Sequence, residues 1–251
     1  MSGPPPLLLR GDSLTRRWGG LVAVNQVSIA LQRDQIHAVI GTNGAGKSTL
    51  INLLSGEIPP SSGTVELLGQ DVTAWSQPRR ARAGLGRSYQ RNTIYPSFSV
   101  LENCRLAAQA RTPKPWAFWQ EAARCPASVA TAREVAARTG LAALVDRPAG
   151  LLSHGQKRQL EIAMCLATEP QVLLLDEPLA GMGAEETDRM LELLRELKPA
   201  HAILLVEHDM DAVFRVADRI TVMVNGAVIA SDTPEAVRSN LEVQAAYLGT
   251  H

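Results

Sequence analysis

The sequence predicts a protein of the α/β class. Two short apolar runs, residues 36–40 and 172–175, have the composition of buried strands in a parallel sheet. The first leads into a glycine-rich loop and then an apolar helical pattern, and the second ends in two acids. A long stretch, about 101–167, is expected to be largely helical. Strand, loop and helix in succession are typical of a sheet covered by helices.

Composition narrows the class of protein. The chain has 251 residues, with 25 basic and 25 acidic side chains, so its overall charge gives no support to nucleic-acid binding through a net positive field. The three cysteines form no C-x-x-C pair, which argues against a disulfide framework or a zinc site and favours reduced, cytosolic thiols; they are Cys104, Cys125 and Cys165.

No apolar stretch approaches the roughly 20 residues that cross a bilayer, and the start has a proline run where a signal peptide needs a charged, then apolar, segment. We therefore expect a soluble chain. Residues 1–6 are predicted to be a disordered lead, and residues 7–251 a single domain.

The segment 41–49 fits the phosphate-binding pattern G-x-x-x-x-G-K-[ST] between a strand and a helix. Its residues are Gly41, Thr42, Asn43, Gly44, Ala45, Gly46, Lys47, Ser48 and Thr49. Glycines let successive backbone N–H groups face anionic oxygens, and the following helix adds its positive end. Lys47 is expected to reach the β- and γ-phosphates, and Ser48 to hold Mg²⁺. Kinases, GTPases and many ATPases share this loop, so it predicts nucleotide binding without fixing a reaction.

The second apolar run ends in Asp176 and Glu177, at the carboxyl end of a predicted parallel strand, where ligand sites of open sheets lie. Asp176 could help to hold Mg²⁺ through water, and Glu177 could orient and deprotonate an attacking water. An Asp-Glu pair after a strand is by itself more often a solvated loop, but the phosphate loop reverses that preference.

Residues 152–159 precede apolar residues at helical spacing, with Ser153 as the expected N-cap. A serine hydroxyl and a glycine N–H at a helix start could form a second anion site, although a simple capped helix would explain the pattern alone.

Taken together, these motifs resemble those of ATP-binding cassette (ABC) ATPases over nearly the whole chain. The family signature appears as residues 152–156 and Walker B with its glutamate as 173–177; Gln90 matches the Q-loop glutamine and His208 the switch histidine. The resemblance implies a RecA-like P-loop NTPase core, an antiparallel β subdomain near the start, and a helical signature-bearing subdomain at about 101–167.

The resemblance also implies roles. Trp18 would stack on adenine, Gln90 would meet the γ-phosphate and Mg²⁺, and His208 would stabilise the γ-phosphate during ATP hydrolysis. Two cassettes would face head to tail, with each ATP between one glycine loop and Ser153, Gly155 and Gln156 of the other. The partners would be transmembrane permease subunits, a second identical or paralogous cassette and, indirectly, an external binding protein, at the cytoplasmic face of a bacterial-type inner membrane.

Weaker features, at 18–20, 156–163, 179–183 and 246–249, resemble importers of branched-chain and other hydrophobic amino acids, with urea or short-amide importers as an alternative. Two residues depart from the family pattern: His154 replaces the first signature glycine, and Gly183 replaces a common aspartate of the D-loop, the segment that couples the two ATP sites.

Two other functions are disfavoured by the sequence. A soluble cassette acting on nucleic acid or ribosomes usually carries two cassettes or an inserted coiled coil, and this chain has neither. A degenerate, non-hydrolysing cassette is disfavoured because the lysine, glutamine, acids and histidine of the family site are present. The arginines at 79, 80, 82, 87 and 91 are expected to form a solvated face, and the aromatic segment 113–119 to pack in the helical part or to dock on the membrane partner.

Overall fold

The computed structural model describes residues 6–89, 93–111 and 125–248. The expectations for residues 1–5, Gln90, Arg91 and the segment 113–119 lie outside these ranges. The predicted division into a lead over 1–6 and one domain over 7–251 stays a prediction.

The described strands are β1 (Leu7–Trp18), β2 (Leu21–Gln32), β3 (Gln35–Gly41), β4 (Ser62–Leu67), β5 (Gln70–Asp71), β6 (Leu85–Arg87), β7 (Val172–Asp176), β8 (Ala202–Val206), β9 (Arg219–Val224) and β10 (Ala227–Asp232). The described α-helices are α1 (Lys47–Ser55), α2 (Gln77–Arg82), α3 (Val100–Arg111), α4 (Pro126–Arg138), α5 (His154–Leu166), α6 (Ala184–Leu197), α7 (Met210–Val216), α8 (Pro234–Ser239) and α9 (Leu241–Leu248). Three short 3₁₀ turns are η2 (Ala142–Leu144), η3 (Ala149–Leu151) and η4 (Lys198–Ala200).

A six-stranded sheet runs in the order β10-β9-β3-β8-β7-β6. β3 pairs in parallel with β8 and β9, and β7 pairs in parallel with β6 and β8, which confirms the predicted parallel sheet. β9 turns into antiparallel β10 through Asn225 and Gly226, both with positive φ, as the Asn-Gly pair predicts. β8 thus lies in the sheet between β3, which leads into the phosphate loop, and β7, which ends in the acids.

The continuous apolar runs arise because both faces of this sheet are covered. In β7, Leu173 and Leu175 pack into one buried cluster, and Val172 and Leu174 pack into the other. Since side chains alternate along a strand, a run buried on both faces must be apolar at every position. All five residues of β7 are buried.

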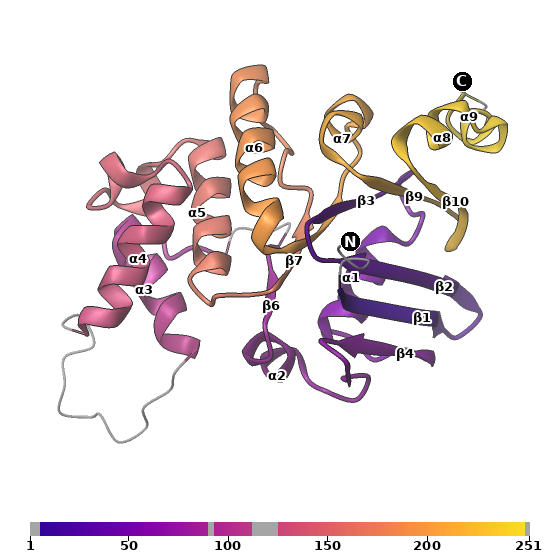
Figure 1. Ribbon diagram of the computed structural model, residues 1–251, viewed down its shortest axis with the longest axis horizontal. Coiled ribbons are helices and arrows are strands. Elements are labelled where there is room, and N and C mark those ends of the chain that lie inside the picture. Colours follow the sequence, from indigo (N-terminus) through magenta and orange to yellow (C-terminus); the bar gives the residue numbers. More distant parts are fainter. Residues whose placement is uncertain (1–5, 90–92, 112–124, 249–251) are drawn as a thin grey trace, which may run out of the picture.

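The second sheet is antiparallel, in the order β2-β1-β4-β5, and α1 packs between it and the large sheet. Figure 1 shows β1, β2 and β4 side by side, with α1 behind them and α3, α4 and α5 grouped at the opposite end of the molecule. The expected strand at 63–69 is present as β4, followed by a tight turn into β5. The expectation of a largely helical part agrees with α3, α4 and α5 in the described residues.

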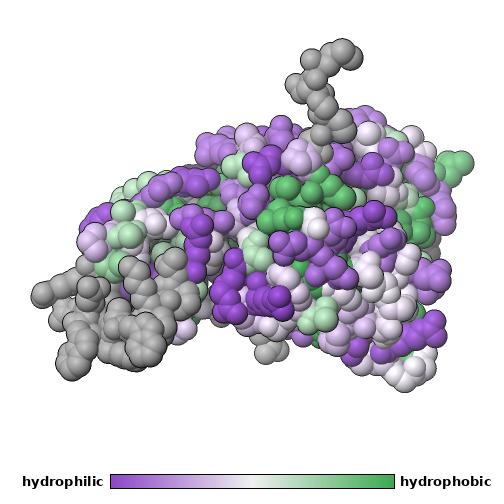
Figure 2. Space-filling view, turned by 60° about the horizontal axis from the view of Figure 1, so that its bottom comes forward, coloured by the Kyte–Doolittle hydropathy of each residue, from purple (hydrophilic) through white to green (hydrophobic). Residues whose placement is uncertain are grey.

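The surface is mixed in character. Figure 2 shows hydrophilic residues around a hydrophobic area near the centre of one face. Among the described residues, no helix is both long and apolar enough to span a membrane.

The expectation of a solvated arginine face is wrong for two of its members. Arg80 is fully buried and donates to the carbonyls of Leu53 and Leu54, at the end of α1. Arg87 donates to Ser55 Oγ and lies 2.6 Å from Glu57. These guanidinium groups bind the carboxyl end of α1, where carbonyls lack helical partners, and so fix the helix that begins at the glycine loop.

Candidate nucleotide-binding site

The glycine loop joins the end of β3 to the start of α1. Gly46 has φ of 100°, a left-handed conformation that other residues rarely adopt. A Cβ on Gly46 would lie 2.4 Å from the carbonyl oxygen of Ala23 on β2. Glycine is therefore required here both by the turn and by the closeness of β2.

The β9–β10 turn supports this loop from behind. Gly226 donates from its N–H to the Ala45 carbonyl at 3.0 Å, and accepts from the N–H of Asn25 at 2.8 Å. The loop, the β9–β10 turn and β2 are thus joined by main-chain hydrogen bonds. Gly226, predicted only as part of a hairpin turn, therefore also holds the loop in place.

Lys47 is buried, and its Nζ donates to the carbonyls of Gly41 at 2.6 Å and Thr42 at 3.1 Å. Burial lowers the pKa of Lys47, and the negative charges of Glu177, Asp176 and Glu207 oppose that shift. Ser48 is exposed at the start of α1, and Thr49 is half-buried beside it. The ammonium therefore lies within electrostatic reach of the acids that follow β7.

Asp176 ends β7 and is buried, and its backbone N–H donates to Ser88 Oγ at 3.2 Å. Its Oδ1 atom is buried without a hydrogen-bond partner among the described residues. Burial raises the pKa of Asp176, an effect that Glu177 reinforces and that Arg87 and Lys47 oppose. A buried carboxylate oxygen without a partner is costly, so this atom is suited to bind a cation or an ordered water.

Glu177 follows in a left-handed conformation, with φ of 49°. Its N–H donates to the Val206 carbonyl at 2.9 Å, which holds it at the end of β8. Such backbone strain costs about 1–3 kcal/mol and persists where neighbouring structure enforces it, most often at functional sites. The half-buried Glu177 side chain is thus positioned by two adjacent strands.

Glu207, which belongs to none of the predicted site residues, is fully buried between these motifs. Its carboxylate accepts from the N–H groups of Leu179 at 2.8 Å and His208 at 3.2 Å. Burial raises its pKa. Glu207 therefore joins the loop after Glu177 to the segment that carries His208, whose own side chain is exposed. The sequence signal for Glu207 is its place directly after the apolar strand β8, the same place that Glu177 has after β7.

The signature segment forms the start of α5. Ser153 is the N-cap: its Oγ accepts from the Gln156 N–H, and the Gln156 side chain accepts from the Ser153 N–H, a complete capping box. The N-cap prediction is confirmed. In Figure 1, α5 and α1 lie on opposite sides of α6 and β7, so the signature and the glycine loop of one chain are apart.

Trp18 ends β1 and is 44% exposed, with the Arg16 guanidinium 5.0 Å from its ring centre. It pairs with Leu21, two residues before the Ala23 carbonyl that contacts Gly46. Its indole is therefore accessible on the sheet that borders the glycine loop.

These features define a P-loop nucleotide-binding protein: a glycine loop between β3 and α1, facing acids at the end of β7. The chain belongs to the ABC transporter family, whose model matches residues 24–180, and it is one of the family's ATP-binding ATPase subunits. Residues 227–251 match a second model, described as branched-chain amino acid ATP-binding cassette transporter.

Two curated relatives span nearly the whole chain. BraF of Pseudomonas aeruginosa, a high-affinity branched-chain amino acid transport ATP-binding protein, is 39% identical over 251 residues, covering 96% of this chain and 98% of the relative. LivG of Escherichia coli, with the same description, is 39% identical over 252 residues, with the same coverage.

Solved structures of ABC transporter cassettes have the same fold as this chain. The ADP conformation of MJ1267, an ATP-binding cassette of an ABC transporter, superposes with a TM-score of 0.87 at 29% identity, covering 97% of this chain and 99% of that one. A nucleotide-free cassette from an ABC transporter gives 0.87 at 28% identity, covering 96% and 99%. The fold expected from the resemblance is confirmed.

Proposed function

We propose that this chain hydrolyses ATP to drive import of branched-chain or other hydrophobic amino acids. The observation that carries the chemistry is the cluster at the end of β7, where the buried Asp176 and the strained Glu177 lie within electrostatic reach of Lys47. The cargo is supported by the match of residues 227–251 and by the descriptions of BraF and LivG.

Each residue of the site has a proposed task. Lys47 and the N–H groups of the loop 41–49 bind the β- and γ-phosphates, and Trp18 stacks on the adenine. Glu177 accepts the proton of the attacking water, and His208 stabilises the γ-phosphate as charge develops there. Gln90, outside the described residues, is proposed to contact the γ-phosphate.

The residues also suit Mg²⁺. The partnerless Oδ1 of Asp176 and the exposed hydroxyl of Ser48 are oxygen donors, the ligand type that Mg²⁺ prefers, and Gln90 is the third proposed ligand. When bound, the ion would neutralise phosphate charge. Asp176 is proposed to hold it while remaining ionised, which the nearby positive charges of Arg87 and Lys47 favour.

The assembly is proposed to contain two cassettes arranged head to tail, with Ser153, Gly155 and Gln156 of one completing the ATP site of the other. The separation of α5 from α1 in one chain supports this arrangement (Figure 1). The remaining partners are transmembrane permease subunits at the cytoplasmic face of the inner membrane and, indirectly, an external binding protein. The second cassette is either a copy of this chain or a paralogue.

The test is the ATPase rate of the chain reconstituted with its co-purifying membrane and cassette partners, with binding protein that is empty or loaded with leucine or urea. Stimulation by the leucine-loaded protein is expected. Stimulation by urea alone would assign a urea or short-amide importer. A rate indifferent to every loaded protein would overturn the import proposal and favour a soluble cassette, for which nucleic-acid binding would then be measured.

A further inference from the structure

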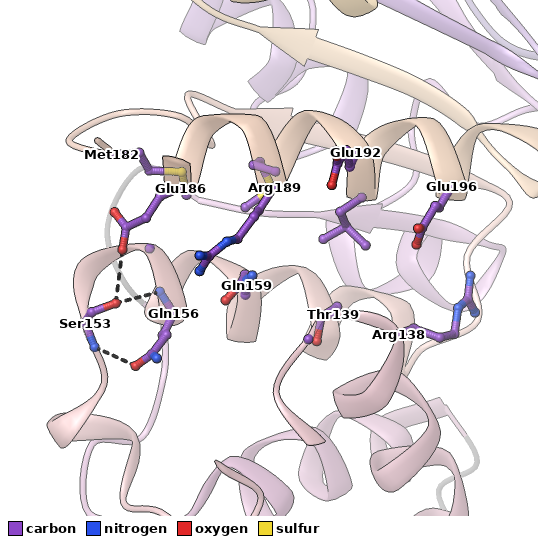
Figure 3. Close-up of a pocket in the computed structure, with 14 residues that line it drawn as sticks. Arg138, Thr139, Ser153, Gln156, Gln159, Met182, Glu186, Arg189, Glu192 and Glu196 are labelled. Atoms are coloured by element: carbon purple, nitrogen blue, oxygen red, sulfur yellow. Dashed lines mark hydrogen bonds between the residues drawn. The ribbon is translucent and has the colours of Figure 1, made fainter. Parts of the chain in front are cut away.

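The start of α5 is covered by an acid from another helix. Ser153 Oγ donates to Glu186 Oε1 at 3.3 Å, and Glu186 lies in the first turn of α6. A Cβ on Gly155 would come within 2.6 Å of this carboxyl group, so Glu186 lies directly on the glycine surface of the signature. Figure 3 shows Glu186 pointing from α6 toward Ser153, with Gln156 beside the serine.

This position is electrostatically that of a bound anion. The first turn of α5 contains no acidic residue of its own, and its N-terminus carries the positive end of a 13-residue helix. Glu186 supplies the negative charge there instead. Its carboxylate binds the serine hydroxyl and covers the glycine, the two groups that the proposed function assigns to the phosphate of a partner's ATP.

The two interactions exclude each other. A serine hydroxyl has a single hydrogen to donate, so Ser153 can donate to Glu186 or to a phosphate oxygen, but not to both. A carboxylate and a phosphate are also like charges, which repel when both approach the same helix end.

We propose that Glu186 is a positioning residue that occupies the signature before ATP does, and that it must withdraw for Ser153 and Gly155 to receive the γ-phosphate bound to the partner cassette. The inference rests on the proposed head-to-tail assembly. Glu186 holds Ser153 in its capping geometry in the open state and raises the ATP concentration that closes the dimer.

The neighbouring acid provides a matched control. Glu185 lies beside Glu186 in the same first turn of α6, is exposed, and forms its ion pair with Arg189 at 3.5 Å. Its replacement by glutamine removes the same charge from the same helix end. Any effect on the macrodipole of α6 or on overall charge is therefore common to both variants.

The experiment compares Glu186→Gln with Glu185→Gln in the reconstituted complex, measuring the half-saturating ATP concentration and kcat. Glu186→Gln should lower half-saturating ATP about threefold to tenfold, as expected for removing one like charge from a solvent-accessible site, with kcat within about twofold. Glu185→Gln should change neither. Glu186→Asp, which keeps the charge, should stay closer to the wild type than Glu186→Gln.

An unchanged or raised half-saturating ATP concentration in Glu186→Gln would overturn the proposal, provided that both variants melt at the wild-type temperature. If Glu186→Gln melts at a lower temperature than the wild type, Glu186→Asp is compared with the charge-free Glu186→Ala instead. Equal half-saturating ATP concentrations in these two variants would overturn the proposal. Failure of the proposed function gives a different result, namely no ATP hydrolysis by the wild-type complex.

Discussion

The imidazole of His154 donates from Nε2 to the carbonyl oxygen of Ala180 at 2.9 Å. A carbonyl can only accept, so Nε2 carries the hydrogen. The ring lies against Gly181, whose Cβ, if present, would be 3.1 Å from it. Ala180 in turn donates to the carbonyl of Glu177 at 3.2 Å. The residue that replaces the usual signature glycine thus joins the start of α5 to the loop that follows the proposed catalytic glutamate.

Replacing His154 by alanine is therefore expected to lower the free energy of unfolding by about 1 kcal/mol, the typical net value of one hydrogen bond. His154→Gln should retain part of this stabilisation, because the glutamine amide can still donate to the Ala180 carbonyl. Urea denaturation of the three proteins measures the difference. Equal stability of the alanine variant and the wild type would show that the bond has no net effect.

His37 predicts a pH dependence of stability. Its Nδ1 bonds to the Ala30 carbonyl and its Nε2 to Thr221 Oγ1, and burial lowers its pKa to about 4, with the charge of Arg219 acting in the same direction. The unfolded chain therefore binds a proton at higher pH than the folded one does. The contribution of neutral His37 to the free energy of unfolding is complete above about pH 6.5. It is lost as the pH falls toward 4, which lowers that free energy by up to about 3 kcal/mol.

His37→Gln should remove this loss. The measured quantity is the difference in unfolding free energy between variant and wild type at pH 7 and pH 4.5. That difference should shift in favour of the variant on acidification, and a constant difference would contradict the assignment.

Gly46→Ala should disrupt the glycine loop. The new Cβ would meet the Ala23 carbonyl at 2.4 Å in a left-handed conformation that costs a further 1–2 kcal/mol or so. ATP affinity should fall by about tenfold or more, in isothermal titration of the full chain. Gly69→Ala is the control: Gly69 also has a positive φ, of 77°, but nothing lies near its Cβ position. Gly69→Ala should lose stability while keeping its ATP affinity. An equal loss of ATP affinity in both variants would mean that the Gly46→Ala effect comes from general destabilisation.

Gly183→Asp should stabilise the chain slightly. Gly183 is the N-cap of α6, has an ordinary φ of −76°, and makes no side-chain cap; a Cβ there would meet no atom within 4 Å. An aspartate can cap the helix and restrict the unfolded chain, for a gain of about 0.5–1 kcal/mol, or roughly 1–4 °C in melting temperature. A lower melting temperature would indicate that the acid conflicts with Glu185 or Glu186.

The sequence predicts those parts of the structure that depend on local pattern. The glycine loop, the strand before it, the helix after it and the Ser153 cap follow from spacing within a few residues, and the structure contains each of them. What the sequence leaves open depends on distant partners. Arg80 appears solvated until the carbonyls of Leu53 and Leu54 are known, since only they compensate its burial.

Two acids near the site were not predicted either, because their partners are also distant in the sequence. Glu207 gains its role from the Leu179 N–H, 28 residues earlier, and Glu186 from Ser153, 33 residues earlier. Neither pairing has a signal in periodicity or composition. The roles of the predicted site residues themselves stay predictions, with Gln90 outside the described residues.

Glu177 is proposed to drive hydrolysis at a site that binds ATP without it. Glu177→Gln is expected to lower the ATPase rate of the reconstituted complex by about 10²-fold or more while leaving the Kd for ATP within about threefold of the wild type. Glu235→Gln, an exposed acid of α8, should leave both unchanged. Near-normal hydrolysis by Glu177→Gln would contradict the account and remove Glu177 from the catalytic role.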